Sequence, residues 1–304
     1  MKTQETPRKT ALDRYEEISD KICQTVLWTF FIVIGTIFLL LGYGAFIASY
    51  YLSISRLMQC AIFCIGSVVM IGMYLLFEKC YRSWNNGILT SGIKSHSCLK
   101  NLGRGMLLGI GMFCAVTIIM ALLGDYRIQS VQFNTMQLVT EIIFYLLVAV
   151  SEECINRGII FRMIDDRWGF AAALVVSSFL FGLGHIFNDE ATIWGCAAIA
   201  IESGVLFGAA YKMSGSLWLP IGIHWTWNVT QGDVFGFIVS GNPQMVTPII
   251  TPKLMGSELI SGGAFGAEAS IISVILGLAI ACWMIYKVAS NKQTVGIVEE
   301  NQCQ

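Results

Sequence analysis

Charged side chains are scarce in this sequence. They make up 13% of the 304 residues, whereas 55% of the residues are hydrophobic and the mean hydropathy is +0.67. Soluble domains carry about 25% charged residues. So few charges cannot cover the surface of a water-soluble protein of this length, and much of the surface must therefore face lipid. The formal net charge of −1 also argues against nucleic-acid binding, which requires a basic surface.

Several common catalytic and metal-binding signatures are absent. The sequence contains no Cys-x-x-Cys, no His-Glu-x-x-His and no Gly-x-Ser-x-Gly, so the usual thiol pair, zinc-protease helix and serine nucleophile turn are excluded. Most of the ten cysteines lie in or beside apolar runs, and we predict free thiols there instead of disulfides. Cys303 is the penultimate residue, whereas a prenylation signal places cysteine fourth from the end. We therefore expect that the chain is not itself prenylated.

What the sequence does contain is a series of long apolar runs. A helix that crosses a bilayer needs about 20 mostly apolar residues. The candidate segments are Val26–Ser49, Leu57–Phe77, Met106–Leu123, Gln137–Val150, Phe170–His185, Ile193–Tyr211, Leu217–Val229 and Ile271–Val288. The first run is too long for the core of a signal peptide, and we interpret it as a retained helix. The sequence therefore predicts an all-α, polytopic integral membrane protein with about eight transmembrane helices.

The basic residues give an orientation. With the N-terminus inside, all but three of the 19 Lys and Arg residues fall on the inner side, the exceptions being Arg56, Arg127 and Lys253. The positive-inside rule predicts this bias, so we expect both termini in the cytoplasm. The predicted organisation is a cytoplasmic segment (1–22), three N-terminal helices (23–135), a core of five helices (136–290) and a cytoplasmic tail (291–304). The core includes a long outer loop (230–268), which we interpret as a connector in preference to a lid.

The first polar cluster at membrane depth is Glu152-Glu153-Cys154-Ile155-Asn156-Arg157. If the helix runs to about Asp166, Glu152 lies roughly 20 Å from its end, at 1.5 Å per residue. A charged residue at such depth costs about 2.5–3.5 kcal/mol or more on insertion scales, which makes it a candidate functional residue. Helical spacing places Glu153 and Arg157 one above the other, while Glu152 points elsewhere. We predict an ion pair between Glu153 and Arg157, and a general-base role for Glu152.

Two further clusters contain histidines. Phe181 and His185 are one helical turn apart and share a face, as do His224 and Asn228. Only three histidines occur in the chain. Together with the glutamates, this set can activate a water and stabilise an oxyanion. Glu152, His185 and His224 could instead hold zinc or another divalent metal with an open position. We favour the metal-free interpretation, in which Asn228 is the oxyanion donor.

These clusters resemble the CPBP family of intramembrane proteases, also called the CAAX-protease or Abi family. Its motifs, E-E-x-x-x-R, F-x-x-x-H and H-x-x-x-N, occur here in the family's order as Glu152-Glu153…Arg157, Phe181…His185 and His224…Asn228. The segments from Gly204 to His224 and from Gly262 to Ser270 also look like the family, the latter like its bacterial branch. The resemblance covers about residues 140–270. Asn156 departs from it, because the family often has an aromatic residue before the motif arginine.

The resemblance implies an intramembrane endopeptidase of a family usually labelled metalloprotease, in a bacterial plasma membrane. By resemblance, Glu152 and His185 activate the attacking water, His224 and Asn228 hold the oxyanion, and Glu153 and Arg157 orient the helix. The expected partners are a membrane-associated peptide or protein substrate and the lipid bilayer. Two other functions stay open: a non-catalytic member that regulates a membrane partner, as in bacteriocin immunity, and a transporter with a Glu–His proton relay. The absence of visible internal repeats counts against the transporter.

Overall fold

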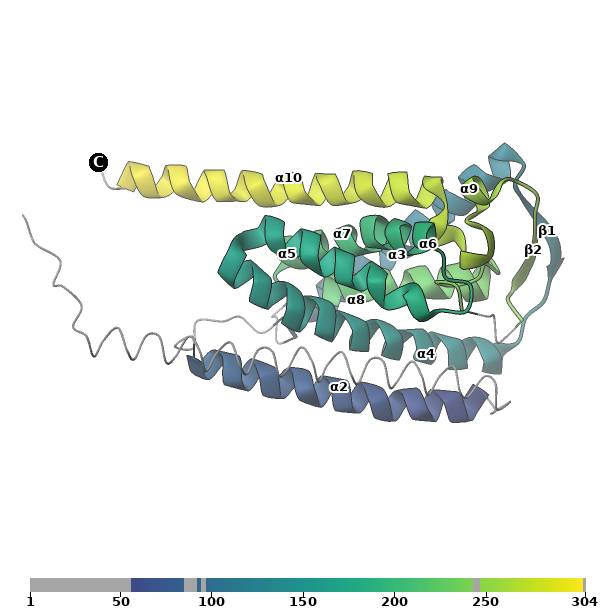
Figure 1. Ribbon diagram of the computed structural model, residues 1–304, viewed down its shortest axis with the longest axis horizontal. Helices are drawn as coiled ribbons and strands as arrows, with labels where there is room; N and C mark the ends of the chain where they lie inside the picture. Colours follow the sequence, from purple (N-terminus) through teal and green to yellow (C-terminus); the bar gives the residue numbers. More distant parts are fainter. Residues whose placement is uncertain (1–55, 85–91, 94–96, 243–246, 303–304) are drawn as a thin grey trace, which may run out of the picture.

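The computed structural model describes residues 56–84, 92–93, 97–242 and 247–302. These residues form a helical bundle with one small two-stranded sheet (Figure 1), so the predicted all-α membrane fold is confirmed. The helices are α2 (Arg56–Trp84), α3 (Cys98–Leu123), α4 (Thr135–Glu153), α5 (Arg162–Gly184), α6 (Ile193–Ile199), α7 (Val205–Ser214), α8 (Trp218–Asn228), α9 (Glu258–Ser261) and α10 (Ile271–Gln302). Short π-helical and 3₁₀ segments connect several of them: η1 (Cys154–Phe161), η2 (His185–Phe187), η3 (Ala200–Gly204), η4 (Val229–Val234), η5 (Gly263–Phe265) and η6 (Ala267–Ala269).

Five helices of the described ranges are long and apolar enough to cross a membrane. Their bounds are Cys64–Tyr81, Cys98–Leu123, Thr135–Phe187, Ile193–Ser214 and Ile271–Ser290. The third of these is bent at Gly169, whose φ of 81° is open mainly to glycine, and it thus joins two of the predicted segments. The predicted segment Val26–Ser49 lies outside the described residues. In Figure 1, α2 and α10 run along opposite long sides of the molecule, with the other helices between them.

Helices α3 and α8 pack with their backbones in close contact. A Cβ atom on Gly105 would lie 2.3 Å from the carbonyl oxygen of Leu219, and one on Gly222 would lie 2.5 Å from the carbonyl oxygen of Leu102. The hydroxyl of Thr226 also donates to the carbonyl of Met106 at 3.1 Å. Small residues permit this approach in membranes, where helix association depends on van der Waals packing and interhelical hydrogen bonds. The contact fixes the position of α8, which carries one of the predicted polar clusters.

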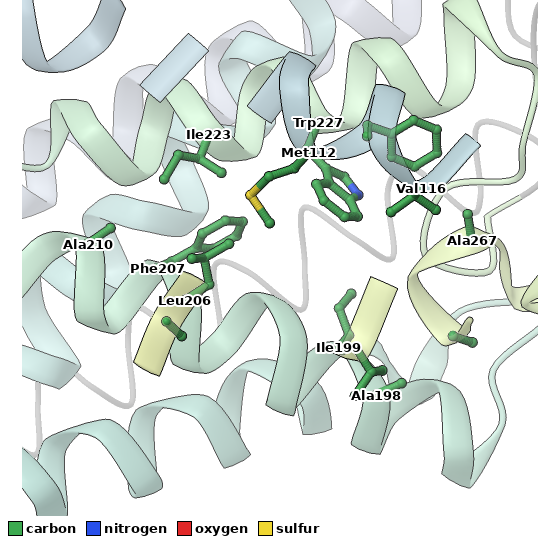
Figure 2. Close-up of a cluster of buried hydrophobic side chains, with 14 of the residues drawn as sticks. Met112, Val116, Ala198, Ile199, Leu206, Phe207, Ala210, Ile223, Trp227 and Ala267 are labelled. Atoms are coloured by element: carbon green, nitrogen blue, oxygen red, sulfur yellow. The ribbon is translucent and has the colours of Figure 1, made fainter. Parts of the chain in front are cut away.

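A large apolar cluster lies between α3, α7, α8 and the segment before α10. Figure 2 shows Met112 and Phe207 pointing toward each other in this cluster, which also contains Trp227. Trp227 is 2% exposed and meets the ring of Phe113 edge-on at 5.1 Å. This core stabilises α8, because apolar atoms at about 4 Å separation gain dispersion energy collectively.

The predicted outer loop contains regular structure. Strand β2 (Ile250–Leu254) pairs antiparallel with β1 (Tyr126–Val131), with a register shift between Ile128 and Ser130. Figure 1 shows this sheet at the end of the bundle opposite the C-terminus. The hydroxyl of Tyr126 donates to the carbonyl of Phe235 at 2.9 Å, and burial raises the pKa of that hydroxyl to about 12. The loop is therefore packed against the bundle, and does more than link two helices.

The described cysteines are free, as the sequence predicts. They are Cys64, Cys80, Cys98, Cys114, Cys154, Cys196 and Cys282.

Candidate active site

The first polar cluster lies where α4 changes its helical geometry. The chain stays helical beyond Glu153, and residues Cys154–Phe161 form the π-helical segment η1 before α5 begins. A π-helical turn inside an α-helix is rare and is often found at functional sites. Gly158 allows η1 to approach α2, since a Cβ there would lie 2.4 Å from the ring of Tyr74. Glu152 and Glu153 therefore occupy the middle of a continuous helical span, as their predicted depth requires.

Glu153 and Arg157 form an ion pair in the predicted i,i+4 arrangement. The Nη1 atom of Arg157 donates to Oε1 of Glu153 at 2.9 Å, and both side chains are completely buried. Nη2 of the same arginine donates to the carbonyl of Gly204 at 3.1 Å. The guanidinium also lies over the rings of Phe181 and Phe207, at 4.5 and 5.1 Å from their centroids. Charge, hydrogen bonds and aromatic faces together stabilise the arginine at a position without water.

His224 binds the same carboxylate oxygen as Arg157. Its Nδ1 lies 3.1 Å from Oε1 of Glu153, and its ring stacks on Phe207 at 5.1 Å with an interplanar angle of 20°. Because Glu153 is tied to Arg157 as an acceptor, we assign the proton to Nδ1 of His224. Nε2 then faces Glu152, whose Oε2 lies 4.0 Å away. Glu153 thus joins α4 to α8 in addition to pairing along its own helix.

Glu152 keeps its carboxylate available. Its side chain is 18% exposed and makes no hydrogen bond to any described residue. Its backbone carbonyl, in contrast, accepts a hydrogen bond from Nδ2 of Asn156 at 3.0 Å. Asn156, the residue that departs from the family pattern, therefore bonds locally to its own helix and leaves the Glu153–Arg157 pair undisturbed. Of the two neighbouring glutamates, Glu153 is bound through Oε1 by Arg157 and His224 while its Oε2 is buried without a hydrogen-bond partner, and the side chain of Glu152 is not hydrogen-bonded.

His185 follows the last residue of α5, begins η2 and lies beside this group. Its Nδ1 is 2.7 Å from the carbonyl of Phe181, and since a carbonyl only accepts, the proton is on Nδ1 and Nε2 is an acceptor in the neutral ring. Phe181 contacts the rings of both His185 and His224, at 5.1 and 6.1 Å between centroids. Phe181 therefore separates the two histidines and packs beneath the guanidinium.

Asn228 ends α8, one turn after His224. It is 5% exposed, and its amide makes no hydrogen bond within the described part of the chain. Glu152, Glu153, Arg157 and His224 thus meet directly, His185 joins them through Phe181, and Asn228 follows on the helix of His224. Sequence reasoning did not assign two participants, Phe207 and the carbonyl of Gly204. Both lie in the segment that resembles the family, which was the available signal.

The possible metal ligands do not converge. In the described ranges, no three His, Cys, Asp or Glu side chains are placed to hold a metal ion. The arrangement therefore does not fit a three-ligand metal site.

A membrane-embedded cluster of paired glutamates, histidines and an asparagine defines a class of candidate hydrolases, and comparison with known proteins narrows that class. Residues 134–230 match a protein-family model described as "Type II CAAX prenyl endopeptidase Rce1-like". The matched segment contains all six predicted site residues. It supports an integral membrane protease of the CAAX or CPBP type, at the level of the family. Comparisons with curated proteins and with solved structures give no significant match.

Proposed function

We propose that the protein is an intramembrane endopeptidase in which Glu152 activates water. The observation that carries the proposal is the division between the two glutamates. Glu153 is completely buried and bound to Arg157 and His224, whereas Glu152 is partly exposed, unbonded and 4.0 Å from Nε2 of His224. A general base needs a carboxylate that is free to accept a proton.

The proposed reaction uses a neutral His185, whose Nε2 is an acceptor, and a His224 that is protonated on both ring nitrogens. Glu152 and Nε2 of His185 accept hydrogen bonds from the two protons of the water. Glu152 takes one proton as the water oxygen bonds to the carbonyl carbon of the substrate, and the carbonyl electrons move to its oxygen. The amide of Asn228 donates to this oxyanion, as does Nε2 of His224 when the imidazole is protonated. Collapse breaks the C–N bond, and the proton held by Glu152 passes to the leaving amine.

We propose a membrane-associated peptide or protein as the substrate, because the catalytic group lies within the helical spans and not on a soluble domain. The protease core corresponds to residues 136–290 in this proposal, with the three preceding helices as support. The motifs that resemble the bacterial branch favour a bacterial plasma membrane. Prenylation of the substrate is a testable refinement, since the matched family is described by its prenyl endopeptidase activity.

The test is Glu152→Gln, with Glu190→Gln as the matched control because Glu190 is exposed and outside the cluster. Both variants and the wild type are reconstituted in liposomes with a fluorogenic farnesylated peptide that ends in a CAAX sequence. In parallel, membranes carrying each variant are compared by terminal-peptide proteomics. We expect cleavage to fall at least 10²-fold in Glu152→Gln, the lower end of what general-base catalysis contributes (about 10²–10⁴-fold).

The outcomes separate the functions. Cleavage lost in Glu152→Gln and kept in Glu190→Gln supports the role of Glu152. Cleavage that persists above about a tenth of the wild-type rate excludes that role, given the size of general-base effects. If wild-type and Glu152→Gln membranes show the same peptides, and no probe is cleaved, the protein is the non-catalytic regulator considered above.

A further inference from the structure

Glu268 is a buried carboxylate that the proposed reaction does not use. It lies in η6, outside the membrane spans, within the segment from Gly262 to Ser270, and is 2% exposed. Three donors surround it. Oε2 accepts from the backbone N–H of Ser240 at 2.6 Å and from Nε2 of Gln231 at 3.0 Å, and Oε1 accepts from the hydroxyl of Ser240 at 2.9 Å. Three donors therefore converge on one buried carboxylate, which holds the Glu268 side chain in a defined position.

Gln231 connects this carboxylate to the helix of His224 and Asn228. Its Oε1 accepts from the indole N–H of Trp227 at 2.7 Å, which fixes the orientation of the amide, so that Nε2 points to Glu268. Trp227 lies between His224 and Asn228 in sequence, and Gln231 follows Asn228 in the π-helical segment η4. A single chain of hydrogen bonds therefore runs from Glu268 to the last turn of α8.

The backbone around Glu268 is shaped for this contact. Ser240, which donates twice to Glu268, has a φ of 51° and is the one non-glycine residue of the described ranges with a positive φ. Such a conformation costs of order 1–3 kcal/mol and persists where surrounding contacts impose it, often at functional sites. Gly266 has a φ of 112°, and a Cβ there would lie 2.0 Å from the carbonyl of Ile238 and 3.1 Å from Nε2 of Gln231. Glycine is therefore required for the segment to reach Gln231.

We infer that Glu268 is a positioning residue for the proposed oxyanion donors: through Gln231 and Trp227 it sets the end of α8 that carries His224 and Asn228. This inference rests on the proposed function. The positioning contact itself does not depend on that function, because the hydrogen-bond chain defines where the last turn of α8 lies whether or not the site cleaves a peptide. The packing of Trp227 against Phe113 fixes the other side of the same turn.

The experiment compares Glu268→Ala and Glu268→Gln with Ser261→Ala as the matched control. Ser261 is a buried serine of the neighbouring segment that bonds to Ser257 and Gly263 and not to Glu268. With the farnesylated peptide as the probe, Glu268→Ala should lower kcat about tenfold with KM unchanged, less than the 10²–10³-fold loss on removing an oxyanion donor outright. Glu268→Gln keeps one acceptor oxygen and should recover most of kcat.

The coupling between two substitutions, measured as the kcat of a double variant, distinguishes a positioning role from a purely structural one. Gln231→Leu combined with Glu268→Ala should cost little more in kcat than either change alone, because both break one chain. Ser261→Ala combined with Glu268→Ala should be additive. A wild-type kcat in Glu268→Ala, or full additivity with Gln231→Leu, overturns the inference.

A second measurement decides the case in which the wild type cleaves no probe. Hydrogen exchange of residues 224–234 should rise in Glu268→Ala and stay at the wild-type level in Ser261→Ala and Glu268→Gln. That result would support the positioning contact of Glu268, even though the absence of cleavage contradicts the proposed protease function. Unchanged exchange in Glu268→Ala overturns the contact itself.

Discussion

Replacing Arg157 by alanine tests whether the buried ion pair holds the candidate site together. The change removes the 2.9 Å bond to Glu153, the 3.1 Å bond to the carbonyl of Gly204 and the contacts with two aromatic rings. Glu153 stays buried with His224 as its remaining neighbour. Removing one partner of a buried pair typically costs about 3–5 kcal/mol. Both side chains are fully buried, so solvent does not screen this interaction. For a chain of this size the expected fall in Tm is about 10 °C.

The assay is thermal unfolding of purified protein in one detergent, with Lys212→Ala as the control. Lys212 pairs with Asp165 across partly exposed side chains, and such surface pairs contribute about 0–1 kcal/mol. A double variant, Arg157→Met with Glu153→Gln, should be more stable than Arg157→Ala, because it leaves no unpaired buried charge. A Tm for Arg157→Ala that is no lower than that of Lys212→Ala refutes this reasoning.

Three other predictions concern packing, pH and metal. Gly222→Ala should lower the free energy of unfolding by about 1–3 kcal/mol, because its Cβ would lie 2.5 Å from the backbone oxygen of Leu102. Gly111 faces open space, so Gly111→Ala should cost nothing. Equal melting temperatures for the two variants would contradict the close packing. Burial raises the pKa of Glu268 from 4.5 to about 7. The folded state therefore binds this proton more tightly, and its stability falls by on the order of 3 kcal/mol as pH rises from about 4.5 to 7. Glu268→Gln should flatten this part of the pH–stability curve, and an unchanged curve contradicts the raised pKa. Chelation should leave cleavage unaffected; loss of activity that zinc alone restores, with one zinc per chain by elemental analysis, overturns the metal-free preference.

Local spacing predicted the elements and contacts that lie within one helix. The pairing of Glu153 with Arg157 follows from the i,i+4 rule. The contact between Glu153 and His224 joins residues 71 positions apart. No periodicity relates them, so their meeting depends on how α4 and α8 pack. The π-helical geometry of η1 was unpredictable for a similar reason, since tertiary packing selects it over an ordinary α-helix.

The outer loop (230–268) also makes contacts that local spacing in the sequence does not predict. The sequence favoured a connector for residues 230–268. Residues 250–254 nevertheless pair with 126–131, which the sequence places more than a hundred positions away. The role of Glu268 depends on donors from two other segments, Gln231 and Ser240. In the sequence, the segment around Glu268 stood out only because its glycine-rich pattern resembles a family. That resemblance predicted no chemical role for Glu268.

The two adjacent glutamates differ because of what they can reach, and this difference organises the candidate site. A buried carboxylate at membrane depth needs hydrogen-bond donors, because an unpaired charge there is costly. Glu153 accepts hydrogen bonds from Arg157, four residues further along the chain, and from His224 on α8. Its charge therefore links the α4 region to α8. Glu152, one residue earlier, is turned by about 100° and misses both donors. The helical geometry that gives Glu153 two partners thereby leaves Glu152 without a side-chain hydrogen bond, partly exposed and facing an imidazole nitrogen. That residual capacity to accept a proton is what the proposed reaction requires, and it arises from the same geometry that stabilises the fold.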